Sequence, residues 1–344
     1  MKARSLKRNT VVKRVLLPLF FVLTVSGTVT AQPISATQKR AQLDAIQAQI
    51  NDQYVMEDLL PAINQNLAVF SGSEAFDKIT TKQAFAEALS RELQTFDKHF
   101  TVRWSAPDTS KTSARNKEPW PQRVARQNYG FAMIEHLKGN IGYLDLRAFA
   151  DLTATTRALA DASMTLLKDS DVVIIDLREN GGGSPDMVRF LSSFLLGTRT
   201  HLNSFKHRHS DEMTEFWTMD DVPSWLAETP LYILTSPDTF SAAEEFTYNM
   251  KHLKRATIVG ETTRGGANPW RYFPTSDNFA VGIPTSMAVN PITQTNWEGK
   301  GVVPHIHAPA QNAKTQAYKE ALKWLAPRVE GYAKEDVETA LSEL

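Results

Sequence analysis

The 344-residue chain contains no cysteine. Disulfide bonds, a thiol nucleophile, thiolate metal sites and a lipid anchor on cysteine are therefore excluded, and packing must stabilise the fold. The chain also lacks an excess of positive charge, because 38 basic residues balance 38 acidic ones. A protein without a basic surplus is a poor nucleic-acid binder, so we expect no nucleic-acid partner.

The N-terminus has an apolar run, but this run is too short to span a bilayer comfortably. The apolar stretch Val15 to Val25 follows six lysines and arginines and precedes the small-residue sequence Val29-Thr-Ala31. This order predicts a cleavable signal peptide over residues 1–31; a retained membrane anchor is the alternative. We therefore expect a periplasmic or secreted protein with no stable membrane span after signal removal. Its mature chain has 32 basic and 38 acidic residues, a net charge of −6.

Apolar periodicity divides the mature chain into four parts. Helical spacing recurs over residues 35–100 and predicts a small N-terminal helical subdomain. The polar segment 101–127 is a predicted linker, either an ordinary crossover loop or a functional lid. Residues 128–310 alternate apolar strands with helices, and residues 311–344 are helical. The alternation predicts an α/β core with a mostly parallel sheet covered on both faces. The expected core strands are 141–146, 172–177, 231–235 and 256–260, then a hairpin of 279–283 and 286–289; the expected helices are 153–167, 185–196 and 242–253.

A serine stands at the predicted start of one core helix. Ser241 follows the buried strand 231–235 and a short turn, and strong helix formers begin at Ala242. Free backbone amides at a helix N-terminus favour an anion, so the Ala242 amide is a candidate oxyanion donor. Ser241 is then a candidate nucleophile for acyl transfer. Ser241 followed by Glu244 is also an ordinary capping box, which needs no catalytic role.

Three consecutive glycines follow another buried strand. Sites in open parallel sheets lie at the carboxyl ends of the strands, and glycine lets the backbone approach a ligand closely. Gly181, Gly182 and Gly183 are therefore candidate substrate-binding residues. A plain strand-to-helix turn is the alternative. A phosphate-binding loop is disfavoured because the lysine of that motif is missing.

A third segment, Gly260 to Ala267, follows the next strand. Within it, Arg264 and Gly265 are candidate substrate contacts; Arg264 either binds a carboxylate or is a solvated loop cation. Two histidine pairs elsewhere have a spacing compatible with metal binding, but solvated loop histidines explain them better. We expect neither a metal nor another cofactor. The pairs are His207 with His209 and His305 with His307.

These motifs, in this order, resemble those of the tail-specific, or carboxyl-terminal processing, serine peptidases. They are most similar to the branch that contains tricorn core protease and the interphotoreceptor retinoid-binding protein modules. The resemblance covers about residues 40 to 310 and implies a crotonase/ClpP-like α/β spiral core preceded by a helical subdomain. No segment resembles the PDZ insertion of longer members. The matching motifs lie at residues 144–146, 176–183, 235–244, 260–267 and 297–304.

The family has two catalytic designs, and the resemblance favours one of them. The lysine of a Ser–Lys dyad would fall on Gly266, and no lysine occurs in residues 261–270. Resemblance to the Ser–His–Glu design implies Ser241 as nucleophile, His99 as general base and Glu298 as its orienting carboxylate. Taken singly, His99 is better explained as a core or surface histidine, and Glu298 as an ordinary hairpin charge.

The oxyanion hole is expected to be the amide of Ala242 and one amide from Gly181 to Gly183, with Gly182 as the first choice. The chain departs from the usual family pattern at Arg264, a common glycine, and at His305, often an aspartate. The sequence thus predicts an exported serine peptidase that hydrolyses unfolded or partly degraded polypeptides through an acyl-enzyme. Two alternatives stay open: a non-catalytic carrier of apolar ligands such as retinoids or fatty acids, and an esterase.

Overall fold

The computed structural model describes residues 32–106, 119–197 and 199–344. The predicted signal peptide and residues 107–118 of the predicted linker lie outside the described residues. Residues 32–344 form one compact unit. No helix in these described stretches is long and apolar enough to cross a membrane.

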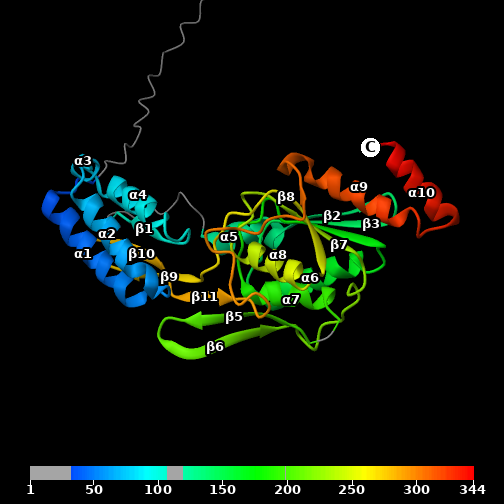
Figure 1. Ribbon diagram of the computed structural model, residues 1–344, viewed down its shortest axis with the longest axis horizontal. Coiled ribbons are helices and arrows are strands. Elements are labelled where there is room, and N and C mark those ends of the chain that lie inside the picture. The colour runs from blue at the N-terminus through cyan, green and yellow to red at the C-terminus, as the bar shows by residue number, and fades with distance from the viewer. Residues whose placement is uncertain (1–31, 107–118, 198) are drawn as a thin grey trace, which may run out of the picture. The chain divides into compact units, whose positions relative to one another are not determined.

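The elements follow the predicted alternation, and Figure 1 labels them in chain order. The helices are α1 Ala36–Gln53, α2 Leu60–Ser71, α3 Glu74–Asp77, α4 Lys82–Leu93, α5 Trp120–Arg126, α6 Ala154–Leu167, α7 Pro185–Leu195, α8 Ala242–His252, α9 Ala313–Leu325 and α10 Gly331–Ser342. The strands are β1 Thr101–Trp104, β2 Phe131–Leu137, β3 Ile141–Leu146, β4 Val172–Asp176, β5 His201–His207, β6 Ser210–Trp217, β7 Leu231–Thr235, β8 Ala256–Gly260, β9 Trp270–Pro274, β10 Phe279–Pro284, β11 Ser286–Val289 and β12 Ile306–His307.

A six-stranded sheet forms the centre of the α/β core, with the order β12-β8-β7-β4-β3-β2. All neighbouring pairs are parallel except the edge pair β2 and β3. Strands β4 and β7 are buried along their whole length, as expected for parallel strands covered on both faces. The predicted mixed α/β fold with a mostly parallel sheet is confirmed.

Alternate side chains of each strand point to opposite faces, and each face has its own helical cover. Val173 and Ile175 of β4 pack in one cluster with α6, α7 and α8. Ile174 of the same strand packs in another cluster with α9 and α10. Figure 1 shows these two sets of helices on opposite sides of the sheet. Because β4 and β7 are parallel neighbours, their carboxyl ends lie side by side at one end of the sheet.

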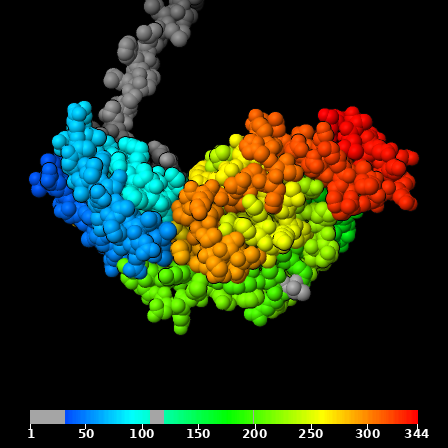
Figure 2. All heavy atoms as spheres, viewed as in Figure 1, coloured from blue at the N-terminus to red at the C-terminus, as the bar shows by residue number. Residues whose placement is uncertain are grey.

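The N-terminal helices pack on strands that come from much later in the chain. Strand β10 pairs antiparallel with both β1 and β9, and its apolar face completes the helical core. Phe279 of β10 is 1% exposed and meets Phe85 of α4 edge to face, with ring centroids 5.7 Å apart. In Figure 2 the late-chain orange residues lie directly against the blue and cyan helices. This region is therefore completed by β9 and β10.

The predicted hairpin of 279–283 with 286–289 is wrong. Strand β10 pairs with β1 and β9, whereas β11 pairs with β5 in a separate antiparallel sheet of order β11-β5-β6. The chain passes from one sheet to the other between Pro284 and Ser286. Antiparallel alternation predicts a strand but does not identify its partner.

We predict that Phe279→Ala lowers the free energy of unfolding by about 3–5 kcal/mol, because it removes a fully buried aromatic ring from the N-terminal core. Urea denaturation measures the change. Val69→Ala on the solvent side of α2, where the side chain is 69% exposed, is the control and should change stability by less than about 0.5 kcal/mol. Equal effects of the two substitutions would contradict the packing of β10 on these helices.

Candidate active site

Ser241 lies in a sharp turn between β7 and α8, at the carboxyl edge of the sheet. Its backbone has φ 56° and ψ −120°, a conformation that costs energy in any residue except glycine. Neighbouring backbone bonds hold the turn: Phe240 N–H donates to Asn180 O at 3.0 Å, and Glu245 N–H donates to Ser241 O at 2.9 Å. The predicted position of Ser241 at a helix N-terminus is confirmed.

The carboxylate of Glu244 connects this turn to the segment after β8. It accepts hydrogen bonds from the backbone of Ser241 at 2.9 Å, Gly265 at 2.6 Å and Gly266 at 2.9 Å. The hydroxyl of Thr263 donates to it as well, at 2.5 Å. Glu244 is fully buried; burial raises its pKa, and these hydrogen bonds oppose the rise. The hydrogen bond from the Ser241 N–H to the Glu244 carboxylate is one of the two bonds of the capping box that the sequence predicts.

The glycine-rich segment after β4 packs directly against this turn. A Cβ added at Gly182 would lie 2.8 Å from Ser241 Cβ and 3.0 Å from Ala242 N, so only glycine fits. The Gly182 N–H donates to Asn180 Oδ1 at 2.8 Å. Asn180 is fully buried and donates in turn to Leu146 O at 2.8 Å. The Gly182 amide, the predicted oxyanion donor, is thus engaged in this structure; the role of Asn180 was not foreseen.

The next amide is the better candidate donor. Gly183 is fixed by the backbone of Phe149, which would meet a Cβ at 1.9 Å. Phe149 N–H donates to Gly182 O, and Ser184 N–H donates to Phe149 O. Neither of these two hydrogen bonds uses the Gly183 N–H. Within the described residues, no hydrogen-bond partner is recorded for the amides of Gly183 or Ala242. Gly183 and Ala242 line the same cavity as Ser241.

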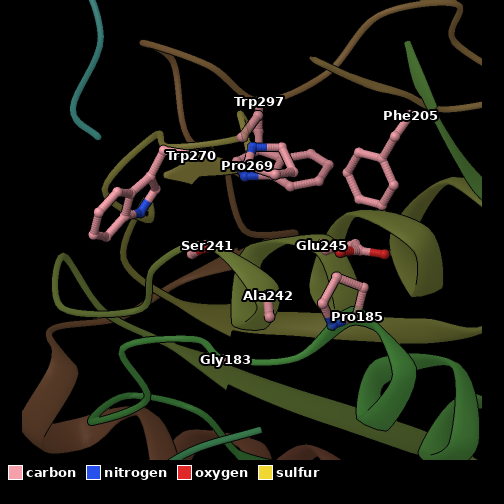
Figure 3. Close-up of a pocket in the computed structure, with 10 residues that line it drawn as sticks. Gly183, Pro185, Phe205, Ser241, Ala242, Glu245, Pro269, Trp270 and Trp297 are labelled. Atoms are coloured by element: carbon pink, nitrogen blue, oxygen red, sulfur yellow. The ribbon is translucent and has the colours of Figure 1, made fainter. Parts of the chain in front are cut away.

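Two cavities meet at Ser241. One has a volume of about 180 Å³ and is also lined by Gly183 and Ala242 (Figure 3). The other, of about 380 Å³, is lined by Ser241, all three glycines and His99. Gly181 to Gly183 therefore line the candidate site, and their predicted substrate contacts stay predictions.

The other two candidate substrate contacts, Arg264 and Gly265, interact with neighbouring residues of the protein. The Arg264 guanidinium forms an exposed ion pair with Asp238 at 2.9 Å and lies over the ring of Phe240. The Gly265 amide donates to Glu244. Neither residue lines the two cavities at Ser241. Their predicted substrate contacts stay predictions.

His99 reaches the cavity from the turn between α4 and β1. It is 5% exposed, and its ring packs against Phe240 at a centroid distance of 4.7 Å. Neither ring nitrogen has a hydrogen-bond partner among the described residues. His99 and Ser241 thus face one cavity without a hydrogen bond between them.

Gly266 makes the room that the His99 ring occupies. A Cβ at this position would lie 2.1 Å from Phe240 Cε2 and 2.9 Å from His99 Cε1. The position that would carry the lysine of a Ser–Lys dyad is therefore closed to any side chain while these two rings stay in place.

Two carboxyl groups, rather than the one expected, lie beside His99. Asp97 Oδ1 is 3.5 Å from His99 Nδ1, and Glu298 has an oxygen within 4.8 Å of both residues. Asp97 accepts from the backbone N–H of His99 at 2.9 Å and from Asn268 Nδ2 at 2.8 Å. Glu298 Oε2 accepts from Ala267 N–H at 2.5 Å, and its Oε1 has no recorded partner among the described residues.

Burial, followed by the charge of Asp97, raises the pKa of Glu298 to about 8. The Glu298 carboxyl is therefore mostly protonated near neutral pH. The indole of Trp297 holds the neighbouring backbone, because its Nε1 donates to Gly266 O at 2.9 Å.

Asp97, His99 and Glu298 also have the residue types and closeness of a metal site. Hydrogen bonds from the protein already occupy Asp97 Oδ1, Asp97 Oδ2 and Glu298 Oε2. A carboxylate pair that orients a histidine explains the same arrangement without an ion, and a chelator distinguishes the two readings.

Comparison with known proteins gives matches to one family. A model of peptidase family S41 matches residues 140–308. The carboxy-terminal-processing protease of Bartonella bacilliformis is 26% identical over 181 residues, which are 51% of this chain and 40% of that protein. A Staphylococcus aureus protein assigned as a CtpA-like serine protease is 25% identical over 161 residues, 46% of this chain and 32% of that protein. The chain thus spans two fifths or less of the length of these curated relatives.

Solved structures share the fold. A protein from Parabacteroides merdae assigned as a peptidase superposes with a TM-score of 0.60 at 16% identity, covering 85% of this chain and 99% of that one. A lipoprotein from Streptococcus agalactiae superposes with a TM-score of 0.51 at 16% identity, covering 92% and 100%. Ser241 and Glu298 lie inside the matched family range, and His99 lies before it.

We predict that Gly266→Ala displaces the rings of Phe240 and His99 and lowers the free energy of unfolding by about 1–3 kcal/mol. The His99 ring signals in an NMR spectrum should shift with the same substitution. Gly181→Ala is the matched control, because a Cβ there meets nothing within 4 Å. Unchanged His99 signals in Gly266→Ala would contradict the close approach of the two residues.

Proposed function

Because the chain belongs to peptidase family S41, we propose that it is a serine peptidase that cleaves peptide bonds through an acyl-enzyme on Ser241. One observation carries the proposal: Ser241, held in a strained turn at a helix N-terminus, lines the same cavity as His99. A strained strand-to-helix turn exposes a serine hydroxyl to a bound acyl group. A nearby imidazole is the base that such a hydroxyl needs.

In the proposed reaction, His99 takes the proton of the Ser241 hydroxyl as that oxygen attacks the scissile carbonyl carbon. His99 then gives the proton to the leaving amine, and water hydrolyses the acyl-enzyme by the same steps. The missing hydrogen bond between the two side chains is compatible with this role, since catalytic hydrogen bonds are often long in free enzymes and shorten when substrate binds.

The oxyanion of the tetrahedral intermediate would be held by the amides of Ala242 and Gly183. Both residues line the same cavity as Ser241, and their amides have no recorded partner in the described part of the chain. Gly182, whose amide donates to Asn180, has a supporting role in this assignment, because it keeps its two neighbours in place. The positive end of the α8 dipole adds to the stabilisation of the negative charge.

Glu298 is the proposed partner of the His99 imidazolium, with Asp97 beside it. Glu298 Oε1 is the acceptor of this pair without a recorded partner. A carboxylate at this place fixes the tautomer of the imidazole and stabilises its charged form. Asp97 limits this function at low pH, since its charge contributes to the raised pKa of Glu298.

The substrates we propose are unfolded or partly degraded polypeptides outside the cytoplasm. The buried setting of His99 and the recessed cavities suit an extended chain better than a folded surface. Export rests on the signal-like residues 1–31. The Bartonella relative is a carboxy-terminal-processing protease. Comparing peptides with free and with capped carboxyl termini tests whether this chain also trims carboxyl ends.

The decisive experiment compares purified mature protein with Ser241→Ala on unfolded casein and on a fluorogenic peptide library. We predict that the substitution lowers kcat/KM by roughly 10⁴–10⁶-fold without changing the unfolding midpoint, because it removes the nucleophile. Ser184→Ala, at the N-terminus of α7, is the matched control and should keep full activity. A fluorophosphonate should label Ser241 and no other residue.

Further arms separate the alternatives. Equal activity of the wild type and Ser241→Ala would reject the proposal. Folded wild type that neither cleaves peptides nor reacts with fluorophosphonate, but binds retinol or a fatty acid, would favour the apolar-ligand carrier. Cleavage of small esters alone would favour an esterase. Loss of activity in EDTA, restored by zinc, would assign the Asp97, His99 and Glu298 cluster to a metal.

We predict that kcat/KM rises about tenfold between pH 7 and pH 9, because Glu298 must be ionised to stabilise the imidazolium and its pKa is about 8. The sign follows from a raised pKa: below pH 8 the carboxyl is mostly protonated. Asp97→Asn should move this rising limb of the pH profile to lower pH by removing the negative charge beside Glu298. Glu298→Gln should abolish the limb and slow turnover by orders of magnitude; an effect under about threefold would assign the role to Asp97.

A further inference from the structure

The smaller cavity at Ser241 has apolar walls and one carboxyl group. Figure 3 shows Trp297, Pro269 and Phe205 along one side, opposite the helix that carries Ser241 and Glu245. Glu245 lies four residues after Ser241 on α8. Residues four apart share one face of a helix, about 6 Å apart along its axis. The helix that begins after the candidate nucleophile therefore also places a carboxyl group on the wall of this cavity, one turn further along.

Glu245 has no compensating cation. It is 3% exposed, and no ion pair within 4.0 Å is recorded for it among the described residues. Burial, and then the negative charge of Asp186 at the start of α7, raise its pKa to about 8. The Asn203 side chain of β5 opposes the rise, although its geometry falls short of a hydrogen bond. A buried acid without a partner costs stability and calls for an explanation in function.

The position of His99 decides which part of a substrate enters this cavity. His99 must protonate the leaving amine, so the leaving-group side of the site is the larger cavity, which His99 lines. The smaller cavity is lined by Ser241, Ala242 and Gly183 but not by His99. It therefore lies on the acyl side, where the side chain of the residue before the scissile bond (P1) is held.

Resting on the proposed role of Ser241, we propose that this cavity is the P1 specificity pocket and that Glu245 makes it select lysine or arginine. The long aliphatic stem of such a side chain would pack against Trp297 and Phe205, and its cationic head would reach the Glu245 carboxylate. The bound cation would favour the ionised carboxylate and supply the missing partner. Asp186 adds negative potential from the neighbouring helix.

The test uses the full mature chain and fluorogenic peptides that differ only at P1: lysine, arginine, norleucine, glutamine and glutamate. Norleucine keeps the aliphatic stem of lysine and removes its charge. We expect the wild type to prefer lysine over norleucine by at least about tenfold in kcat/KM. Glu245→Gln should lower that ratio at least about tenfold, while kcat/KM for norleucine stays within about threefold.

Three further measurements keep the test independent of folding and of the proposed function. The fluorophosphonate labelling rate of Ser241 should be the same in the wild type and Glu245→Gln. Benzamidine, an aromatic cation, should compete with the norleucine substrate more weakly in Glu245→Gln. Glu179→Gln, at an exposed loop position outside both cavities, should leave the P1 profile unchanged.

Failure of this inference is distinguishable from failure of the proposed function. A wild type that labels and cleaves but prefers norleucine would overturn the assignment of Glu245 alone, as would a lysine preference that survives in Glu245→Gln. A wild type that neither labels nor cleaves would overturn both. Should Glu245→Gln fail to fold, Glu245→Asp, which retains the charge at a shorter reach, should favour arginine over lysine more strongly than the wild type does; an unchanged ratio would count against the proposal.

Discussion

The arrangement at the sheet edge depends on one buried carboxylate. Glu244 accepts hydrogen bonds from the turn that carries Ser241 and from the segment that ends in Gly266. The first segment presents the serine in a strained backbone conformation, and the second leaves the space that the His99 ring fills. Because both segments are tied to one fully buried side chain, neither can relax without breaking a hydrogen bond in a medium of low dielectric.

The acidic groups around this edge have different environments and therefore different uses. Hydrogen bonds surround Glu244, which makes it structural. Glu298 keeps one oxygen without a recorded partner and shares its surroundings with Asp97. Glu245 is buried without a cation and lines a cavity. Glu244 thus holds backbone segments, whereas by our proposals Glu298 orients the base and Glu245 binds the substrate, because burial and neighbours set the behaviour of each glutamate.

Much of the fold could be predicted because its signals are local. The buried strands 141–146 and 231–235 are apolar runs of the right length, and the capped start of α4 at Thr81 is a short sequence pattern. Pairing is a different matter. Strand β10 joins β1, more than 170 residues earlier, and nothing in either segment specifies that partner. The pairing error at β10 and β11 has this origin.

The sequence by itself determined that a serine begins a helix at the carboxyl end of a parallel strand, since periodicity, capping and glycine content are properties of neighbouring residues. It also named His99 and Glu298, through resemblance alone. Only the tertiary structure decided that Gly182 donates to Asn180, that Asp97 stands beside Glu298, and that Glu245 faces a cavity without a cation. Each of these depends on groups from separate segments meeting in a buried space, where distance and solvation are set by packing and not by the order of residues.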